Sequence, residues 1–488
     1  MKTFFQRVAK RIGLYEAIAF TTGFVLMAFE LVASRILAPA IGTSTYVWTS
    51  VIGVMIAALA VGYATGGWIA DRRERRSDIA WLLMLAAVTI LTTCTFYDDT
   101  LTLIVRTVHD PRIQGVIAAT FLFAPASFLM GMTSPYLAKL RVASIQTTGR
   151  SVASLSAANS FGGIAGTFCT GFIFFTIIGS RETLILLAAV LLLCGLTMTV
   201  RGQQKLRALV IVGLSATALL TIAVPAQAGV VADIDTPASR YKVIDTKVNN
   251  QPTRVLIMGP SGLQSGSYLS GSKDLVFSYP RKMAEVVAAM PHKKRILILG
   301  GGAFSLPEYF GRHYPDSQVD VAEIDPALPG IAQKYFNYQQ PANVHVTAQD
   351  ARIFLASVTN PYDIIIFDAY NDLSLPFSLA TREYAAALKA ALRPDGAVIA
   401  NIIAADNPQC SPLLSRLQAS YKTAFKNAQL YPLGDPTLKR RENIIGLYTN
   451  TDLDWAQSVP GATNIAIASA DALIDNHAPI EYLQQQCE

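Results

Sequence analysis

Seven long apolar segments fill the first 225 residues, and they limit what this chain can fold into more than any other feature. Each has 18 residues or more, which at about 1.5 Å of helical rise per residue crosses most of the roughly 30 Å of bilayer hydrocarbon. The pattern predicts a multi-span α-helical membrane domain over residues 1–228. The expected spans are 14–33, 47–70, 79–97, 115–138, 153–178, 183–200 and 208–225.

Basic residues in the connecting loops predict the orientation of these spans. With a cytoplasmic N-terminus, 14 lysines and arginines fall in cytoplasmic loops and only four fall outside. Loops rich in lysine and arginine stay on the cytoplasmic side of a membrane, so we expect a multi-pass inner-membrane protein with its N-terminus inside. Seven spans then place the C-terminal half on the periplasmic or extracytoplasmic side.

Charge separates the two halves of the chain. Residues 1–229 hold 18 Lys+Arg against 9 Asp+Glu, whereas residues 230–488 hold 22 against 25. The basic excess lies in short loops between apolar segments, where membrane orientation accounts for it. We therefore expect the lipid bilayer as a partner of the first half and no nucleic-acid partner.

Two polar features of the membrane half have alternative explanations. Glu30 precedes Arg35 by five residues near the end of the first span, and such residues form either a functional pair or an ion pair at the helix end. Several glycines are expected to mark close helix contacts rather than ligand sites. These are Gly62, Gly66, Gly67, Gly162, Gly163 and Gly166.

The second half reads as two soluble parts. Residues 229–272 contain short β-prone runs separated by Asn249-Asn250 and glycine-rich turns, which predicts a small antiparallel β unit. Over residues 273–488 apolar strands alternate with helical stretches, which predicts a Rossmann-like, doubly wound, mostly parallel sheet. The expected strands are 295–299, 318–323, 343–347, 362–367, 396–402, 427–431 and 443–449.

Glycines or carboxylates follow the first four of these strands. Gly300, Gly301 and Gly302 close the first, Glu323 ends the second, Asp350 follows the third and Asp368 ends the fourth. Parallel strands end at one edge, where such sheets bind ligands. Glycines let the backbone approach a nucleotide, and an acid at the next strand end accepts hydrogen bonds from ribose hydroxyls. Singly, Glu323 and Asp350 also fit a helix N-cap or a solvated loop acid.

Several other chemistries lack a signature in the sequence. There is no zinc-type Cys/His spacing, no phosphate-loop lysine and no nucleophile elbow. We therefore expect no metal, no phosphoryl transfer and no serine hydrolysis. Cys410 and Cys487 are the only cysteines of the soluble half, and outside the cytoplasm they form either a disulfide or two free thiols.

With these residues identified, nearly the whole chain resembles the membrane-integrated branch of the spermidine synthase (polyamine aminopropyltransferase) family, whose catalytic domain has a class I methyltransferase-like fold. In the membrane half the likeness rests on residues 30–39, 42–50 and 67–73, the last of which is also similar to the cytoplasmic loop signature of major facilitator transporters. In the soluble half it rests on Leu263-Gln264-Ser265-Gly266, Gly300-Gly301-Gly302, Glu323-Ile324-Asp325-Pro326, Gln349-Asp350-Ala351 and Asp368-Ala369-Tyr370.

The resemblance implies decarboxylated S-adenosylmethionine as a co-substrate, with no prosthetic group, and a polyamine or other amine as the acceptor. It implies that Glu323 holds the ribose, that Asp350 with Ala351 holds the adenine, and that the three glycines line the nucleoside. Asp368 would be the catalytic acid that takes the reacting amine. The remaining substrate-binding residues would be Gln264 on the aminopropyl side, Tyr279, Tyr370 and Asp372.

Two departures from the family pattern leave the acceptor open. Where soluble members carry Asp-x-x-Asp, this chain has Asn371 at the second acid and Asp372 one place later. Tyr279 is followed by Pro280 and Arg281 in place of histidine and glutamate, and an arginine facing the site would repel a cation. The oligomeric state, including a homo-oligomer, is also left open.

Two rival functions share these features. An S-adenosylmethionine-dependent methyltransferase has the same fold and the same nucleoside contacts. A transporter or sensor could bind a polyamine or nucleoside in a soluble domain that does no chemistry, and Glu30 inside a span would support it. A carboxylate base with Gln264 beside the sulfonium favours an aminopropyl group over a methionine side chain.

Overall fold

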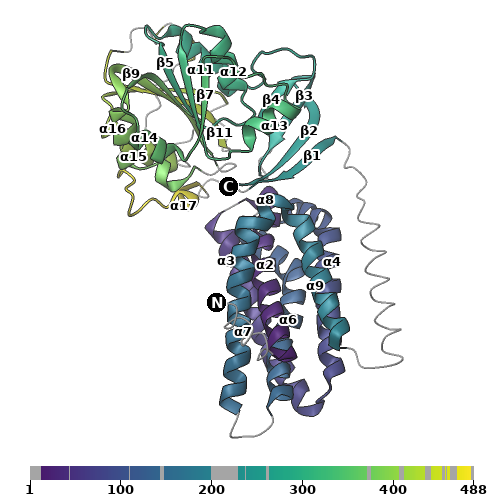
Figure 1. Ribbon diagram of the computed structural model, residues 1–488. Helices are drawn as coiled ribbons and strands as arrows, with labels where there is room; N and C mark the ends of the chain where they lie inside the picture. Colours follow the sequence, from purple (N-terminus) through teal and green to yellow (C-terminus); the bar gives the residue numbers. More distant parts are fainter. Residues whose placement is uncertain are drawn as a thin grey trace, which may run out of the picture. The chain divides into compact units, whose positions relative to one another are not determined.

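The computed structural model of the chain (Figure 1) describes residues 13–42, 44–108, 110–142, 148–198, 229–236, 238–259, 263–370, 375–405, 412–434, 441–452, 457, 459–461 and 470–484. The chain divides into two compact units. The first comprises Met1–Gln227 together with Ile234–Arg240, and the second comprises Ala228–Asp233 together with Tyr241–Glu488.

The first unit is a bundle of long helices (Figure 1). Among its described residues, four helices are long and apolar enough to cross a membrane, or five if the pair α5 and α6, bent by 54°, counts as one span. The four are α2 (Leu14–Ile41), α3 (Thr45–Arg72), α4 (Arg76–Thr107) and α9 (Gly179–Met198). The other elements are α5 (Pro111–Leu122), α6 (Ala124–Arg141), α7 (Thr148–Cys169), the π-helical turn η2 (Thr170–Phe174) and α8 (Phe175–Ile177).

The expected span over 153–178 is helical but broken by the π-helical turn, and it is not among the helices that meet the length and hydropathy criteria. The expected span over 208–225 lies outside the described residues. Most of the predicted glycines make close helix contacts, but Gly67 makes only an ordinary one, 3.8 Å from Pro135 Cβ. A Cβ added at Gly62, Gly66, Gly162 or Gly166 would come within 2.5 Å of a backbone oxygen of a neighbouring helix.

The predicted pairing of Glu30 with Arg35 is wrong. Arg35 Nη1 donates to the Thr236 carbonyl at 2.7 Å, and its guanidinium lies 4.6 Å from the centre of the Phe175 ring. Residues five apart on an α-helix point about 140° away from each other, so the two side chains leave the helix on different sides. Glu30 makes no ion pair among the described residues.

The second unit begins with a four-stranded sheet in the order β1-β2-β3-β4. Strand β2 pairs antiparallel with β3, and β3 pairs antiparallel with β4. Asn249 and Asn250 have φ of 51° and 62°, the left-handed conformation that a tight hairpin between β2 and β3 requires. The predicted small antiparallel unit is confirmed. Its strands are Val230–Asp235, Arg240–Val248, Gln251–Ile257 and Leu263–Tyr268.

A seven-stranded sheet in the order β10-β11-β9-β8-β5-β6-β7 forms the rest of the unit. Neighbouring strands from β9 to β7 are parallel, whereas β11 is antiparallel to both β9 and β10. The predicted doubly wound, mostly parallel sheet is confirmed, with one strand reversed. The strands are β5 (Arg295–Leu299), β6 (Gln318–Glu323), β7 (Val344–Ala348), β8 (Tyr362–Phe367), β9 (Leu392–Ala405), β10 (Asn427–Pro432) and β11 (Arg441–Thr449).

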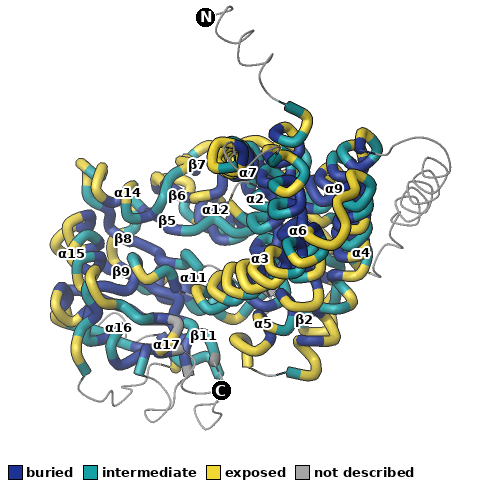
Figure 2. The backbone as a smooth tube through the Cα atoms, turned by 90° about the horizontal axis from the view of Figure 1, so that it is seen from below, coloured by how far each residue is buried: buried dark blue, intermediate teal, exposed yellow. Residues whose placement is uncertain are grey.

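Helices shield the central strands of this sheet. All six residues of β8 are buried, and so are the last four of β5 (Figure 2). Strands buried along their whole length are found where both faces of a sheet are covered. The covering elements are α11 (Ser278–Ala289), α12 (Ser305–His313), α13 (Leu328–Tyr335), α14 (Ala351–Ala356), η3 (Phe377–Leu379), α15 (Arg382–Ala390), α16 (Pro412–Lys422) and α17 (Ile480–Gln484).

Candidate active site

The four strands whose ends carry the predicted site residues are neighbours in the sheet. Their order is β8, β5, β6, β7, and all four run parallel. The residues that follow their carboxyl ends therefore share one rim. The rim is made by Asp368 after β8, Gly300–Gly302 after β5, Glu323 at the end of β6 and Asp350 after β7.

Gly300 allows two strand ends to approach each other. Its φ is +99°, and a Cβ there would lie 2.3 Å from the carbonyl oxygen of Asp368. Gly302 also has a positive φ, +55°. A side chain at Gly300 would meet both a left-handed backbone and the neighbouring main chain. The turn between β5 and α12 lies against Asp368, and it can do so only because Gly300 has no side chain.

Glu323 is bonded to the glycine turn. One carboxylate oxygen accepts from the Gly301 N–H at 2.7 Å and the other accepts from the Asp325 N–H at 2.9 Å. Burial raises the pKa of Glu323 above its ordinary value, and these backbone donors lower it in part. Each carboxylate oxygen has a second lone pair. The side chain can therefore fix the turn and still accept from a ligand hydroxyl.

Asp350 is the N-cap of α14. Its Oδ1 accepts from the backbone N–H groups of Arg352 at 2.9 Å and Ile353 at 3.1 Å. The helix-cap explanation therefore describes the fold correctly. It does not exclude a ligand role, since both capping bonds use Oδ1. Ala351, the first residue of α14, lies beside it.

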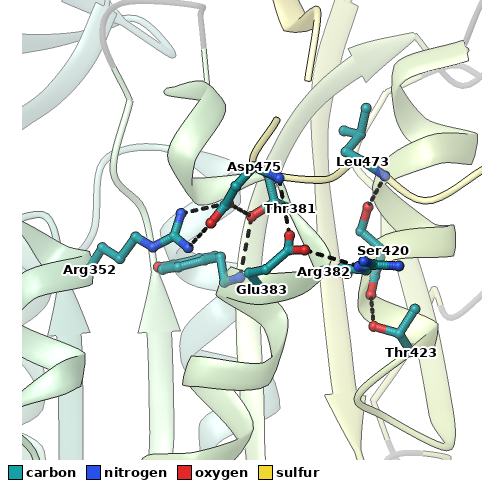
Figure 3. A network of polar contacts seen from close by, with 9 residues as sticks. Arg352, Thr381, Arg382, Glu383, Ser420, Thr423, Leu473 and Asp475 are labelled. Atoms are coloured by element: carbon teal, nitrogen blue, oxygen red, sulfur yellow. Dashed lines mark hydrogen bonds and ion pairs between the residues drawn. The ribbon is translucent and has the colours of Figure 1, made fainter. Parts of the chain in front are cut away.

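The C-terminal segment is bonded to α14 through Asp475 and Arg352 (Figure 3). Asp475 binds Arg352 through both carboxylate oxygens, one of them 2.9 Å from Nη1. Asp475 also accepts from the Thr381 hydroxyl at 2.7 Å, and Arg352 donates to the Ser378 carbonyl at 2.9 Å. The hydrogen bonds from Arg352 lower the pKa of Asp475. The helix that Asp350 caps is thereby tied to the segment before α15.

Asp368 stands at the centre of a chain of hydrogen bonds. The Tyr279 hydroxyl, from the first turn of α11, bonds its carboxylate, and Asn401 Nδ2 donates to Oδ1 at 2.9 Å. Asn443 Nδ2 in turn donates to Asn401 Oδ1 at 2.9 Å. Burial raises the pKa of Asp368, and the Asn401 and Tyr279 donors partly offset that rise. The arrangement holds a carboxylate with a raised pKa, as a base that acts near neutral pH needs.

Tyr370 braces the segment that follows β8. Its hydroxyl donates to the Asn401 carbonyl at 2.8 Å and accepts from the Ile403 N–H at 3.1 Å. Burial raises the pKa of this hydroxyl. Both bonds lead to β9, so the hydroxyl is used to hold the rim. The predicted substrate residue Asp372 lies outside the described residues.

The small sheet reaches the glycine turn through β4. Ser265 Oγ accepts from the Ala303 N–H at 2.7 Å, and a Cβ at Gly302 would lie 2.9 Å from the same Oγ. Gln264, predicted to bind the aminopropyl side, is the residue before Ser265 in β4. The backbone of Gln264 is thus one residue from a contact with the glycine turn.

Arg281 is bonded away from Asp368. Its guanidinium donates to the carbonyls of Leu275 at 2.6 Å and Val276 at 2.8 Å and to the Tyr268 hydroxyl at 2.7 Å. It therefore fixes the segment before α11, whereas Tyr279 bonds the acid. The expected repulsion between Arg281 and a cationic acceptor has no support in this geometry.

Sequence reasoning did not identify Asn401, Asn443 or Ser265 as site residues. Asn401 was visible as a lone amide in the apolar run of β9, and Ser265 as part of the motif that contains Gln264. Asn443 left no signal, because it stands near the beginning of its strand. Only the antiparallel direction of β11, which pairs Ile445 with Asn401, brings it to the rim.

Within the described ranges, no group of three or more His, Cys, Asp and Glu side chains could hold a metal ion. Cys410 and Cys487 lie outside those ranges, so their pairing stays a prediction.

Comparisons with known proteins give the following. Residues 276–450 match the spermine/spermidine synthase domain. The polyamine aminopropyltransferase of Vibrio vulnificus is 33% identical over 181 residues, which are 36% of this chain and 58% of that protein. The human eEF1A lysine and N-terminal methyltransferase is 28% identical over 142 residues, 27% of this chain and 20% of that protein. The chain thus spans less than two thirds of either relative.

A crystal structure described as a probable spermidine synthase from Corynebacterium glutamicum is 23% identical. The alignment covers 48% of this chain and 93% of that one, with a TM-score of 0.42.

Proposed function

We propose that this chain, which carries a spermine/spermidine synthase domain at residues 276–450, is a membrane-bound aminopropyltransferase. It transfers the aminopropyl group of decarboxylated S-adenosylmethionine to a di- or polyamine and releases methylthioadenosine. The family match and the Vibrio vulnificus relative support the class of reaction.

The observation that carries the proposal is the position of Asp368. Its carboxylate lies on the rim that also carries the nucleotide turn, bonded to Tyr279 and Asn401. Its main chain touches Gly300 closely enough that no side chain fits between them. A base is thereby held beside the place where a nucleoside would bind.

In the proposed reaction, Asp368 is the base that an amine acceptor needs. An alkylammonium has a pKa of roughly 10, so its nitrogen is no nucleophile until a carboxylate orients it and removes a proton. The freed lone pair forms a bond to the carbon next to the sulfonium sulfur. The carbon–sulfur bond breaks, its electron pair neutralises the sulfur, and the proton goes to Asp368. A base with a raised pKa is well matched to this step.

The other rim residues would hold the donor. Glu323 accepts from the ribose hydroxyls, Asp350 and Ala351 bind the adenine edge, and the glycines of 300–302 let the backbone approach the nucleoside. Gln264 lies on the aminopropyl side. Tyr279, Tyr370 and Asp372 would bind the amine.

The four apolar helices support a place in the membrane. We extend the proposal to an inner-membrane protein with a domain over 1–228 in the bilayer, a cytoplasmic N-terminus and a soluble half, 229–272 and 273–488, outside the cytoplasm. The loop charges support this orientation. A C-terminal reporter that is active only in the cytoplasm would contradict it.

The test is a panel of amines offered to the purified full-length protein with decarboxylated S-adenosylmethionine, read by mass spectrometry. We expect methylthioadenosine and one aminopropylated amine. Asp368→Asn should lower the rate by about a hundredfold to ten-thousandfold, because general-base catalysis contributes about 10² to 10⁴, while methylthioadenosine binding persists. Asp316→Asn, an exposed aspartate before β6, is the matched control. Absence of methylthioadenosine with every amine would overturn the proposal.

The human relative favours one alternative, an S-adenosylmethionine-dependent methyltransferase. The same assay separates the two functions when it is repeated with S-adenosylmethionine. A methyltransferase yields S-adenosylhomocysteine and a methylated acceptor, and an aminopropyltransferase yields neither.

A further inference from the structure

Helix α2 crosses helix α7 at two glycines. A Cβ at Gly162 would lie 1.9 Å from the Phe20 carbonyl oxygen, and one at Gly166 would lie 2.2 Å from that of Phe24. The contacts advance in the same direction along both helices, so α2 and α7 run parallel. Spacings of four residues between small side chains are typical of close helix packing in membranes.

Helix α3 crosses helix α6 in the same way. A Cβ at Gly62 would lie 2.3 Å from the Phe128 carbonyl oxygen, and one at Gly66 would lie 2.5 Å from that of Met132. These two helices also run parallel. The second crossing repeats the first. Helix α3 corresponds to α7, because each supplies the glycines, and α6 corresponds to α2, because each supplies the carbonyls.

The register of the two crossings is also the same. Phe20 and Phe24 correspond to Phe128 and Met132, a shift of 108, and Gly62 and Gly66 correspond to Gly162 and Gly166, a shift of 100. A third contact in each crossing obeys these shifts. Gly23 approaches the Asn159 carbonyl, and Gly131 approaches that of Leu59.

Burial follows the same correspondence. Residues 51–70 and 151–170 are buried, half-buried or exposed at the same positions, with the single exception of Tyr63, which is exposed, and Gly163, which is buried. An accidental likeness at three contacts would not extend over twenty consecutive positions. Helices α3 and α7 therefore have equivalent surroundings.

The remaining two helices, α4 and α9, cross each other, and exchanging one helix for the other reproduces their contacts. The Cys94 thiol lies 3.9 Å from the Arg181 carbonyl, and a Cβ at Gly195 would lie 3.1 Å from the Ala80 carbonyl. A shift of 101 converts the first pair into the second. The six helices thus form two repeats, α2-α3-α4 and α6-α7-α9, which leaves α5 as an insertion.

The two repeats have opposite orientations. Helix α2 is parallel to α7, and α7 follows α6 after a short connection that reverses the chain, so α2 and α6 run in opposite directions. An anchor needs only apolar length. Inverted repeats with a substrate site between them are a common design of transporters, because exchanging the conformations of the two halves opens the site to the other side.

Glu30 indicates the charge of what such a unit would carry. It is the only charged residue of α2 between Glu16 and Arg35, and it lies about 7.5 Å along the helix from Arg35. It is half-buried and makes no ion pair among the described residues. Charges inside spans usually mark an ion or substrate path.

The π-helical turn η2 and the adjoining α8 pack against another face of α2, about 120–140° around the helix from Glu30. Phe24 and Arg35, on either side of Glu30 in α2, contact Phe174 and Phe175 at 6.2 Å between ring centres and 4.6 Å from guanidinium to ring centre. Thr170, in the same turn, is fully buried, and its hydroxyl has no hydrogen-bond partner in the described part of the chain. Single π-helical turns inside α-helices are frequent at functional sites.

We propose that the helical unit is a transporter made of two inverted repeats, and that it moves an organic cation whose amine binds Glu30. The identity of the cation as the acceptor or product of the soluble half rests on the proposed function. Transport itself does not.

The test uses the full-length protein in proteoliposomes, with labelled putrescine, spermidine and tetraethylammonium as probes and no sulfonium donor present. We expect saturable uptake of at least one probe. Glu30→Gln should lower that uptake at least tenfold and leave aminopropyl transfer in detergent unchanged, which separates loss of transport from loss of folding. Saturable uptake without methylthioadenosine formation would retain the transporter and overturn the proposed function instead.

The symmetry has its own test. Gly62→Ala and Gly162→Ala should each lower uptake, by similar factors, because they disturb equivalent crossings. Gly53→Ala, where nothing lies within 4 Å of the added Cβ, is the matched control and should transport normally. No uptake of any probe by protein that elutes as a single species, or full uptake by Glu30→Gln, would overturn the transporter.

Discussion

The hydroxyl of Tyr279 bonds the carboxylate of Asp368, and it comes from a helix that is far from β8 in the sequence. With Asn401, it gives the acid two donors on a rim that otherwise raises its pKa by burial. Burial raises the proton affinity of the proposed base, and two side chains that can each be removed without touching the acid lower it in part.

Tyr279→Phe tests this control. Removing the donor leaves the ionised form less stabilised, so the pKa of Asp368 should rise further and the acid limb of the pH–rate profile should move to higher pH. A hydrogen bond to a charged group contributes about 1.5–3 kcal/mol, and kcat/KM near neutral pH should fall by about tenfold to a hundredfold. An unchanged limb with lower activity would show that Tyr279 only contacts the acceptor.

Glu323→Gln should weaken nucleoside binding. The amide keeps the shape of the side chain but loses the charge that the Gly301 N–H binds and that ribose hydroxyls would bind in the proposed site, and methylthioadenosine should dissociate about ten to a hundred times more readily. For the unchanged protein, affinity should also drop as the pH falls through the raised pKa of Glu323. Titration calorimetry over a pH series measures both effects. A pH-independent affinity would remove Glu323 from the ribose site.

Gly300→Ala should destabilise the soluble half. The new Cβ would meet the Asp368 carbonyl at 2.3 Å with φ at +99°, and such strain costs about 1–3 kcal/mol. Gly330→Ala in α13 is the control, because nothing lies within 4 Å of its added Cβ. It should be neutral or stabilising by up to about 1 kcal/mol. Equal denaturation midpoints for the two variants would contradict the close approach of β5 and β8.

Arg352→Ala should loosen the C-terminal segment around Asp475 and, through the first turn of α14, weaken nucleoside binding. The pair is partly exposed, so the loss of global stability should stay below about 1 kcal/mol, and amide hydrogen exchange is the better measurement. Because the pKa of Asp475 is lowered in the folded state, its contribution is present above its ordinary pKa and is lost as the pH falls through the folded value. Lys389→Ala, which changes an exposed side chain of α15, should leave exchange in residues 470–484 unchanged.

The sheet was predictable because its information is local. Each buried strand is an apolar run bounded by polar residues, and parallel strands deliver their ends to one rim whatever the loops do. Asn443 was not predictable in this way, since its place depends on the pairing of β11 with β9. Tyr279 was expected in the acceptor pocket by resemblance, but its bond to Asp368 is a tertiary contact.

Less of the organisation of the membrane half than of the soluble half could be predicted from the sequence. Its helices are visible as apolar lengths, but the repeats share few identical residues away from the crossings: residues 51–70 and 151–170 are identical only at Ala57, Ala58, Gly62 and Gly66 and their equivalents. What the repeats share is the pattern of burial, which a sequence of uniformly apolar residues does not display. The error at Glu30 and Arg35 came from judging proximity by chain distance instead of by angle around the helix.

The amide side chains of Asn401 and Asn443 also restrict the route by which a proton can leave Asp368. Asn443 donates to the oxygen of Asn401, which leaves the Asn401 nitrogen pointing at Asp368, and amide groups of this kind neither take up nor release protons near neutral pH. Asn401 and Asn443 therefore cannot relay a proton away from Asp368. Under the proposed function, a proton taken from an amine would leave Asp368 by a route other than these amides, with the product or with solvent, and turnover should then depend on buffer concentration.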